Sequence, residues 1–261
     1  MTVLSHLKKI SNSAVLSGTE KKSINTSIAT LEQRLEYYFS KEISEKFKFG
    51  SSTRGTILPR NMDRSSDIDY MVVFSDDSYK PSTYLNKLKK FVDRYYSTSE
   101  IYQSSPTIVL ELSHIKFDLV PAIDDVWSGY KIPASAADYL EWVSTNPNDF
   151  NQTLIDKNIE HKSLIKPLIR LIKYWNSKNN YVFDSYLLEK QIVGMYFWSC
   201  SDLKEYFYKA INNLEVDYFA AQWKHDKVTR AKEVVAKTME YENDDMPYTA
   251  ESEIKKLIPE I

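Results

Sequence analysis

The spacing of apolar residues changes from helical to strand-like early in the chain. The helical part predicts a long amphipathic helix that leads into a short strand ending at Phe49. The apolar face of this helix is formed by Ile24, Ile28, Leu31, Leu35 and Phe39. A polar turn with two of the five glycines follows, and the segment Asp67–Phe74 then predicts a second strand. The chain therefore begins with helix, strand, turn and strand.

The next segment is typical of a helix followed by a hairpin. Residues 82–95 place their apolar side chains on one helical face. The runs "TIVLEL" and "IKFDLVPAI" predict two strands, which Ser113 and His114 join as a hairpin. We therefore expect the first half of the chain to build a sheet with helices beside it.

Beyond Pro133, almost every segment has a helical pattern. We expect Ser163 and Ser185 to be the N-caps of two helices, because each precedes an apolar periodic run. Two more helices are predicted over residues 228–241 and 249–258, on either side of the acidic turn "ENDDMP". The sequence thus predicts an α+β protein in which a sheet-bearing lobe precedes a helical lobe.

Composition and charge exclude several classes of protein. The net charge of −2 does not favour a protein that coats nucleic acid, although a local basic groove stays compatible with it. Cys200 is the only cysteine, which excludes an intrachain disulfide framework and a multi-cysteine zinc module. The N-terminal stretch lacks the apolar core of a signal peptide, and no apolar run is long enough to span a bilayer. We therefore expect a cytoplasmic protein without a membrane partner.

Three aspartates stand in segments that otherwise predict buried strands. Asp67 and Asp69 are two residues apart, so they project from the same face of their strand. Buried like charges repel unless a cation neutralises them, and Mg²⁺ selects hard oxygen ligands of this kind. Asp118, in the middle of "IKFDLV", supplies a third carboxylate if the two strands are neighbours. The three predict a two-metal site that activates a hydroxyl and stabilises a leaving pyrophosphate.

The glycine-bearing turn before the second strand has the composition of a phosphate-binding loop. Gly50 permits a close approach of the backbone, and Ser51 offers a hydroxyl and an N–H group to phosphate oxygens. Gly55 permits the bend that follows. Taken alone, each of these residues is at least as typical of an ordinary turn or strand end as of a catalytic or phosphate-binding site. Their order along the chain, together with the three acids, favours chemistry over a structural role.

These residues resemble a known family. "FGSSTRGT", "DIDYMVVF" and "FDLVPA" are similar to the signature of the DNA polymerase β-like nucleotidyltransferases. The later run "LIRLIKYWNSKNNYVFDSYLLEKQIV" resembles the oligoadenylate synthetase-like branch, in particular the cGAS/DncV-like nucleotidyltransferases of bacterial anti-phage signalling. The resemblance extends to about Val193 and more loosely to the end of the chain.

The resemblance implies a bilobal fold: a catalytic lobe over residues 1–150, a helical lobe over 151–261, and an N-terminal helix that packs across both. It implies that Asp67, Asp69 and Asp118 bind two Mg²⁺ ions, for which Mn²⁺ is a possible substitute, and catalyse nucleotidyl transfer. Gly50 and Ser51 match its phosphate-contact positions, and Lys173 and Ser185 match residues that contact the donor triphosphate. Lys173 also lies on a helical stripe with Lys166 and Arg170, a pattern more often typical of a solvated face.

The family implies nucleoside triphosphates as substrates, with ATP first among them. It further implies an oligonucleotide product, cyclic or linear, that a separately encoded effector protein senses. No stable nucleic-acid partner is predicted. Two alternatives stay open: transfer to an RNA 3′ end or to a protein hydroxyl, and an inactive module that only binds nucleotides.

Overall fold

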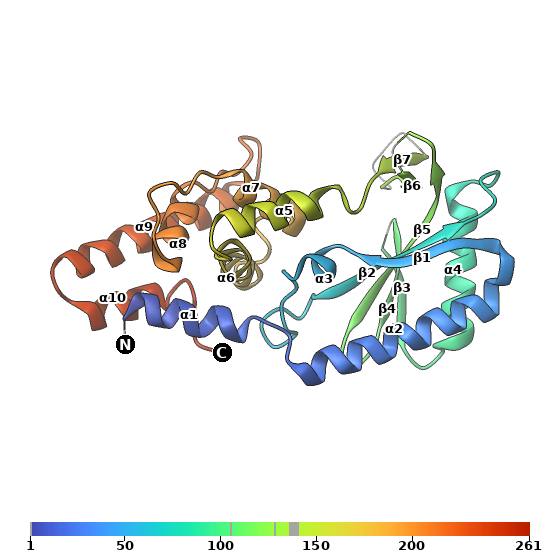
Figure 1. The fold of residues 1–261 in the computed structure, drawn as a ribbon, viewed down its shortest axis with the longest axis horizontal. Helices are drawn as coiled ribbons and strands as arrows, with labels where there is room; N and C mark the ends of the chain where they lie inside the picture. Colours follow the sequence, from blue (N-terminus) through green and yellow to red (C-terminus); the bar gives the residue numbers. More distant parts are fainter. Residues whose placement is uncertain (1, 105, 128, 136–140) are drawn as a thin grey trace. The chain divides into compact units, whose positions relative to one another are not determined.

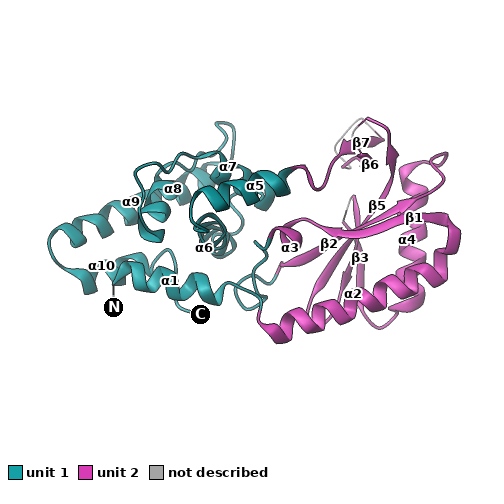
Figure 2. Cartoon of the chain, in the orientation of Figure 1, with its two compact units in different colours: residues 1–16, 55–64, 150–261 teal, residues 17–54, 65–149 magenta. Residues whose placement is uncertain are grey.

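The computed structural model describes residues 2–104, 106–127, 129–135 and 141–261. The chain forms two compact units (Figure 2). Unit 1 comprises residues 1–16, 55–64 and 150–261, and unit 2 comprises residues 17–54 and 65–149. The longest continuous piece of unit 1 begins at residue 150, and two earlier segments belong to this unit as well. Each unit is therefore assembled from separate pieces of the chain.

Unit 2 is built on a mixed sheet. Among the described residues the sheet has seven strands, in the order β1-β2-β5-β4-β3, with β6 beside β5 and β7 beside β6 (Figure 1). The strands are β1 Ile43–Phe49, β2 Asp67–Phe74, β3 Glu100–Ser104, β4 Thr107–Glu111, β5 Lys116–Asp125, β6 Gly129–Pro133 and β7 Trp142–Thr145. β2 and β5 are parallel, and the other pairings are antiparallel. The predicted mixed sheet and the hairpin of β4 and β5 are confirmed.

Helices cover one face of this sheet. Unit 2 contains α2 Gly18–Phe39, the short α3 Ser51–Arg54 and α4 Pro81–Tyr95, and α2 packs against both α4 and β1. α2 begins at a capping box, because Ser17 and Glu20 each accept the other's backbone N–H. Beneath the helices, the Phe39 ring lies 5.3 Å from that of Phe74 and 5.7 Å from that of Phe91. Packing of these side chains fixes the register of β2, so the alternate residues of β2 project from the other face.

Unit 1 is helical and has one large apolar core. Its helices are α1 Val3–Ser13, α5 Asp149–Glu160, α6 Ile165–Lys178, α7 Ser185–Gly194, α8 Leu203–Asn212, α9 Gln222–Asn243 and α10 Pro247–Ile254 (Figure 1). α1 packs against α6, α8 and α10, and the segment Gly55–Arg64 adds Leu58 and Met62 to the same core. Residues far apart in the chain thus complete a single hydrophobic interior.

Two predicted N-caps are wrong. The residue before α6 is Leu164, and Ser163 lies one position earlier with a φ of 64°, a left-handed conformation that an N-cap does not adopt. The cap of α7 is Asp184, whose carboxylate accepts two backbone N–H groups of the first turn, both at 2.9 Å. Ser185 is instead the first residue of the helix. An exposed aspartate in front of the serine was thus the stronger cap.

The prediction of an almost wholly helical chain beyond Pro133 is also wrong at one point. Trp142–Thr145 forms β7, which pairs with β6. The strand is only four residues long, so its sequence contains too few alternations to indicate a strand. The helical expectation for residues 136–140 lies outside the described residues. In the described part of the chain, no helix has the length and apolar character that crossing a membrane requires.

Candidate functional site

The three predicted acidic residues lie on two neighbouring strands of unit 2. Because β2 and β5 run parallel, Asp67 is opposite Lys116 and Asp69 is opposite Asp118. Side chains alternate across a strand, so all four project from the same face of the sheet. This is the face that α2 and α4 do not cover, since the intervening residues of β2 contact these helices. The fold therefore brings together carboxylates that are separated by about fifty positions in the sequence.

A lysine lies between two of these acids. Lys116 Nζ is 3.1 Å from Asp67 Oδ2 and 3.6 Å from Asp118 Oδ1. Only 15% of the Lys116 side chain is exposed, so both ion pairs are partly buried. Lys116 is not among the residues predicted from the sequence. Its position two residues before Asp118, in the same strand, was the signal that could have identified it.

The ionisation of Asp118 is strongly perturbed. Burial, and then the neighbouring charge of Asp67, raise the pKa of Asp118 to about 6, and the Lys116 ammonium only partly offsets them. Burial acts against the charged form of Lys116, but the charges of Asp67 and Asp118 outweigh it and raise the pKa of Lys116. The Asp118 Oδ1 atom is buried and accepts no hydrogen bond from the part of the chain that the structure describes. Asp118 therefore presents a buried oxygen with unused capacity to bind a cation.

The acidic face suits a divalent metal ion in its chemistry. Asp67, Asp69 and Asp118 are hard oxygen donors on one surface, and the orphan Asp118 oxygen lies among them. Over the residues described, however, no group of three or more His, Cys, Asp or Glu side chains is arranged to hold a metal ion. The positive charge beside Asp67 and Asp118 is the Lys116 ammonium instead. The residues thus suit Mg²⁺ in type and share one face of the sheet, while Asp67 and Asp118 are paired with a lysine.

The turn after β1 lies directly against Asp69. Phe49, the last residue of β1, is opposite Asp69, and Gly50 follows with a φ of 71°. A Cβ at position 50 would lie 1.9 Å from Asp69 Oδ2, which is too close for any side chain. Only glycine therefore satisfies both the left-handed backbone and the contact with the carboxylate.

The predicted phosphate-contact residue Ser51 begins the short helix α3. The neighbouring hydroxyls are already used within the turn: Ser52 donates to the Phe49 carbonyl at 3.1 Å, and Thr53 donates to the Gly50 carbonyl at 2.8 Å. These bonds stabilise the turn that lies against Asp69. Gly50, Ser51, Asp67, Asp69 and Asp118 all belong to unit 2.

Lys173 and Ser185, in contrast, belong to unit 1. Lys173 on α6 is buried, and its Nζ lies 3.1 Å from Glu189 Oε1 on α7. The same Glu189 oxygen accepts a hydrogen bond of 2.7 Å from the Thr56 hydroxyl. Glu189 is fully buried, so this network ties α6, α7 and the segment Gly55–Arg64 together. The sequence did not predict Thr56 or Glu189 in this network, because a lone glutamate on a helix carries no signal of its partner.

The basic stripe predicted on α6 is directed at the segment Gly55–Arg64 rather than into solvent. Arg170 Nη1 donates to the Gly55 carbonyl at 3.1 Å, and Lys166 Nζ lies 4.0 Å from the position of a Cβ on Gly55. Ser185 is half-buried in the first turn of α7, one residue after the Asp184 cap. Three basic side chains of α6 thus lie near one backbone segment of unit 1.

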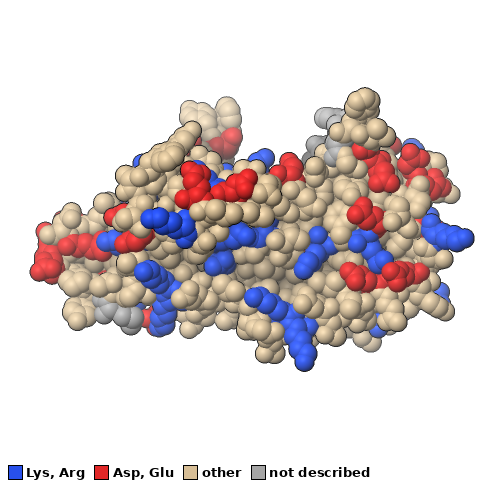
Figure 3. All heavy atoms as spheres, viewed as in Figure 1, with Lys and Arg blue, Asp and Glu red and all other residues tan. Residues whose placement is uncertain are grey.

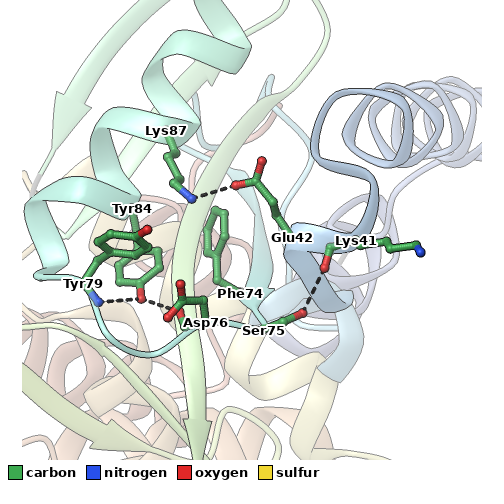
Figure 4. Close-up of a pocket in the computed structure, with 8 residues that line it drawn as sticks. All are labelled: Lys41, Glu42, Phe74, Ser75, Asp76, Tyr79, Tyr84 and Lys87. Carbon is green, nitrogen blue, oxygen red and sulfur yellow. Dashed lines mark hydrogen bonds and ion pairs between the residues drawn. The ribbon is translucent and has the colours of Figure 1, made fainter.

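A cavity of about 460 Å³ lies at the other end of β2 (Figure 4). It is lined by Lys41, Glu42, Phe74, Ser75, Asp76, Tyr79, Tyr84 and Lys87. Asp67 is the first and Phe74 the last residue of β2, so at about 3.3 Å per residue the cavity lies roughly 20 Å from the acidic face. Lys87 Nζ is already 2.6 Å from Glu42 Oε2. The cavity is therefore separate from the acids, and two of its four charged side chains, Lys87 and Glu42, are paired with each other.

Both signs of charge are interspersed on the visible face of the molecule (Figure 3). Acidic side chains gather at the turn between α9 and α10, where Asp244 and Asp245 are exposed. For the described residues in this view, no broad basic surface is present.

Comparison with known proteins identifies relatives of the chain. Residues 1–158 match the family model described as the Second Messenger Oligonucleotide or Dinucleotide Synthetase domain. The chain is 29% identical over 198 residues to a "probable cyclic nucleotide synthase" of Bacillus cereus, which covers 61% of this chain and 57% of the relative. It is 32% identical over 73 residues to a cyclic AMP-AMP-AMP synthase of Acinetobacter sp., which covers 28% of this chain and 21% of the relative. The chain thus spans about half the length of the first relative and less of the second.

Solved structures share the fold. Vibrio cholerae DncV, a cyclic AMP-GMP synthase bound to a linear intermediate, has a TM-score of 0.81 at 10% identity, over 99% of this chain and 95% of that one. E. coli CdnC with ATP has a TM-score of 0.72 at 14% identity, over 98% of each chain. At these identities the likeness concerns the fold alone. The polymerase β-like architecture that the sequence implied is confirmed.

Proposed function

Because the chain belongs to the Second Messenger Oligonucleotide or Dinucleotide Synthetase domain family, we propose that it joins nucleoside triphosphates into an oligonucleotide second messenger and releases pyrophosphate. The product is cyclic or linear, and no template is needed. ATP is the first substrate to test, since the names of two relatives, cyclic AMP-AMP-AMP synthase and cyclic AMP-GMP synthase, both include adenine nucleotides.

The observation that carries this proposal is the acidic face of unit 2. Asp69 and Asp118 are in register on parallel strands, Asp67 projects beside them, and the Gly50 turn lies against Asp69. Carboxylates that share one face repel one another, so a fold that keeps them there indicates that a cation is to be bound. The parallel pairing of β2 and β5 is what makes a joint role for these distant residues possible.

Asp67, Asp69 and Asp118 would hold two Mg²⁺ ions, or Mn²⁺ in their place. When bound, these ions supply the charge that lowers the pKa of an attacking hydroxyl and stabilises the leaving pyrophosphate. We further propose that Asp118 lies nearest the attacking hydroxyl. Charge neutralisation and positioning account for most of the rate in transfers of this type.

Gly50 and Ser51 would bind phosphate oxygens through the backbone and hydroxyl of the turn. Lys173 and Ser185 would contact the donor triphosphate. Lys173 pairs with a buried Glu189, so we propose that its ammonium serves both partners, as a structural cation and as a phosphate contact. We further propose that the protein acts in the cytoplasm in anti-phage signalling, where a separately encoded effector protein senses the product.

The test is direct. The purified full chain is incubated with the four labelled nucleoside triphosphates and Mg²⁺, with Asp69→Asn as the matched inactive variant. Mass spectrometry of the products reports the bases, the linkage and ring closure. We expect a phosphatase-resistant or oligomeric product that depends on Asp69. Labelled RNA or labelled protein in place of a small product would indicate a different acceptor, and binding without any turnover would indicate an inactive module.

A further inference from the structure

The Lys116 ammonium lies where two of the proposed metal ligands converge. It is close to both Asp67 and Asp118, and its side chain is mostly buried. We infer that Lys116 is a positioning residue: it acts as an internal counter-cation that holds these carboxylates before metal binds, and it leaves as a divalent cation enters. This inference rests on the proposed function for the identity of the metal ligands.

The strand register explains why the lysine reaches both acids. Lys116 is opposite Asp67 across the parallel ladder and two residues before Asp118 on its own strand, so the three side chains share one face. Without a positive charge here, Asp67 and the buried Asp118 would repel each other. The ammonium therefore makes the metal-free arrangement of the acids possible. It also explains why Asp67 and Asp118 are paired with a lysine, while the described residues contain no group of three such side chains arranged to hold a metal ion.

A second carboxylate lies within reach of the displaced ammonium. On the other side of β5, the antiparallel strand β4 places Glu111 opposite Lys116. Directly opposed residues project from the same face, with Cβ atoms about 5 Å apart, within easy reach of a four-carbon side chain. Lys116 can thus turn from Asp67 toward Glu111 and keep a carboxylate partner. Withdrawal of the ammonium frees the buried Asp118 oxygen, which accepts no hydrogen bond from the described residues.

Two cations that compete for the same carboxylates weaken each other's binding. A neutral residue at position 116 should therefore tighten metal binding while it destabilises the metal-free protein. A lysine with a purely structural role would lower stability without any gain in metal affinity. These opposite effects distinguish the two roles.

The experiment compares Lys116→Met with the wild type, without nucleotide and at pH 7.5. Isothermal titration with Mn²⁺ measures metal affinity, and thermal unfolding in EDTA measures the metal-free stability. Lys46→Met is the matched control. Lys46 is also a partly buried lysine on a strand, and its Nζ lies 2.6 Å from one acidic partner, Glu36. It projects from the opposite face of the sheet, away from the acids. Lys116→Arg keeps the charge and is the conservative variant.

We expect Lys116→Met to bind Mn²⁺ about tenfold or more tightly and to unfold at a lower temperature in EDTA. Lys116→Arg and Lys46→Met should bind Mn²⁺ with the wild-type affinity. Unchanged or weaker Mn²⁺ binding by Lys116→Met, in a protein whose binding is lost in Asp69→Asn, would overturn this inference alone. If the wild type bound no Mn²⁺, or if Asp69→Asn bound it normally, the metal site of the proposed function would fail and the inference with it.

Discussion

Replacement of Gly50 by alanine tests the geometry of the acidic face most directly. Two separate penalties apply at this position: the left-handed φ of 71°, and a Cβ that would lie 1.9 Å from Asp69 Oδ2. A non-glycine residue in the left-handed region costs about 1–2 kcal/mol. Displacing a packed side chain adds a further ~1–3 kcal/mol. We therefore expect Gly50→Ala to lower the free energy of unfolding by about 2–5 kcal/mol, and to move the Asp69 carboxylate.

Gly55→Ala separates the two penalties. Gly55 has nearly the same φ, 73°, but the nearest atom to an added Cβ is Lys166 Nζ at 4.0 Å. This variant should therefore show only the backbone term of about 1–2 kcal/mol. Gly18→Ala is a second control, since its Cβ would meet nothing within 4 Å and its φ is not left-handed. We expect its stability to match the wild type or to exceed it by up to about 1 kcal/mol.

Urea unfolding in EDTA gives the three free energies, and Mn²⁺ titration reports whether Asp69 stays in place. We expect Gly50→Ala to lose much more metal affinity than Gly18→Ala. If Gly50→Ala cost no more than Gly55→Ala and bound Mn²⁺ like the wild type, the close contact between the turn and Asp69 would be refuted.

Three further predictions concern buried charges. The folded-state pKa of Asp118, about 6, lies above its ordinary value of 3.8, so the metal-free protein loses stability as the pH rises from about 3.8 to about 6, and the loss is complete above 6. Asp118→Asn should therefore be more stable than the wild type by up to about 3 kcal/mol at pH 8 in EDTA but equal to it at pH 4, and an equal gain at both pH values would contradict this. Lys173→Met leaves Glu189 buried without its cation and should cost about 3–5 kcal/mol in urea unfolding; adding Glu189→Gln should restore most of it. Triphosphate binding, measured by fluorescence titration, should stay weak in that double variant, and recovery of binding would exclude Lys173 as a phosphate contact. Thr56→Val should lower the free energy of unfolding by about 1.5–3 kcal/mol, because it removes the hydrogen bond to Glu189. Thr56→Ser keeps the hydroxyl and should lower it by less than about 1 kcal/mol. Equal losses in the two variants would show that the hydrogen bond is not the cause.

The sequence was most informative where one residue pattern had one explanation. Alternation of apolar and acidic residues predicted the strand Asp67–Phe74 with both of its ends, and it placed Asp67 and Asp69 on one face. The same alternation also places Lys116 and Asp118 on one face of their strand. A lysine in a strand is usually solvated, however, so its pairing with Asp67 could be identified only once the order of the strands was known. Strand order depends on contacts across the whole chain, which no local window contains.

Local signals failed where a stronger neighbour or a tertiary contact decided the outcome. Asp184 displaced Ser185 as a helix cap, because an ionised carboxylate accepts backbone N–H groups more strongly than a hydroxyl does. Glu189 was not among the predicted residues, and it proved to be fully buried because Thr56 and Lys173 satisfy its carboxylate. Partners of this kind are determined by the tertiary structure and cannot be identified from the sequence alone.

The interleaving of the two units constrains how the protein can be made. Unit 2 is complete once the ribosome has passed residue 149, whereas α1 must wait for α6, α8 and α10 before its apolar face is covered. His6 Nε2 also lies 2.7 Å from the Ile258 carbonyl oxygen, so α1 is held by a residue 252 positions further along the chain. During translation the apolar face of α1 therefore stays uncovered until α6, α8 and α10 have been made. A chain released before that point would carry a folded unit 2 and an incomplete unit 1, which chaperones and proteases would recognise.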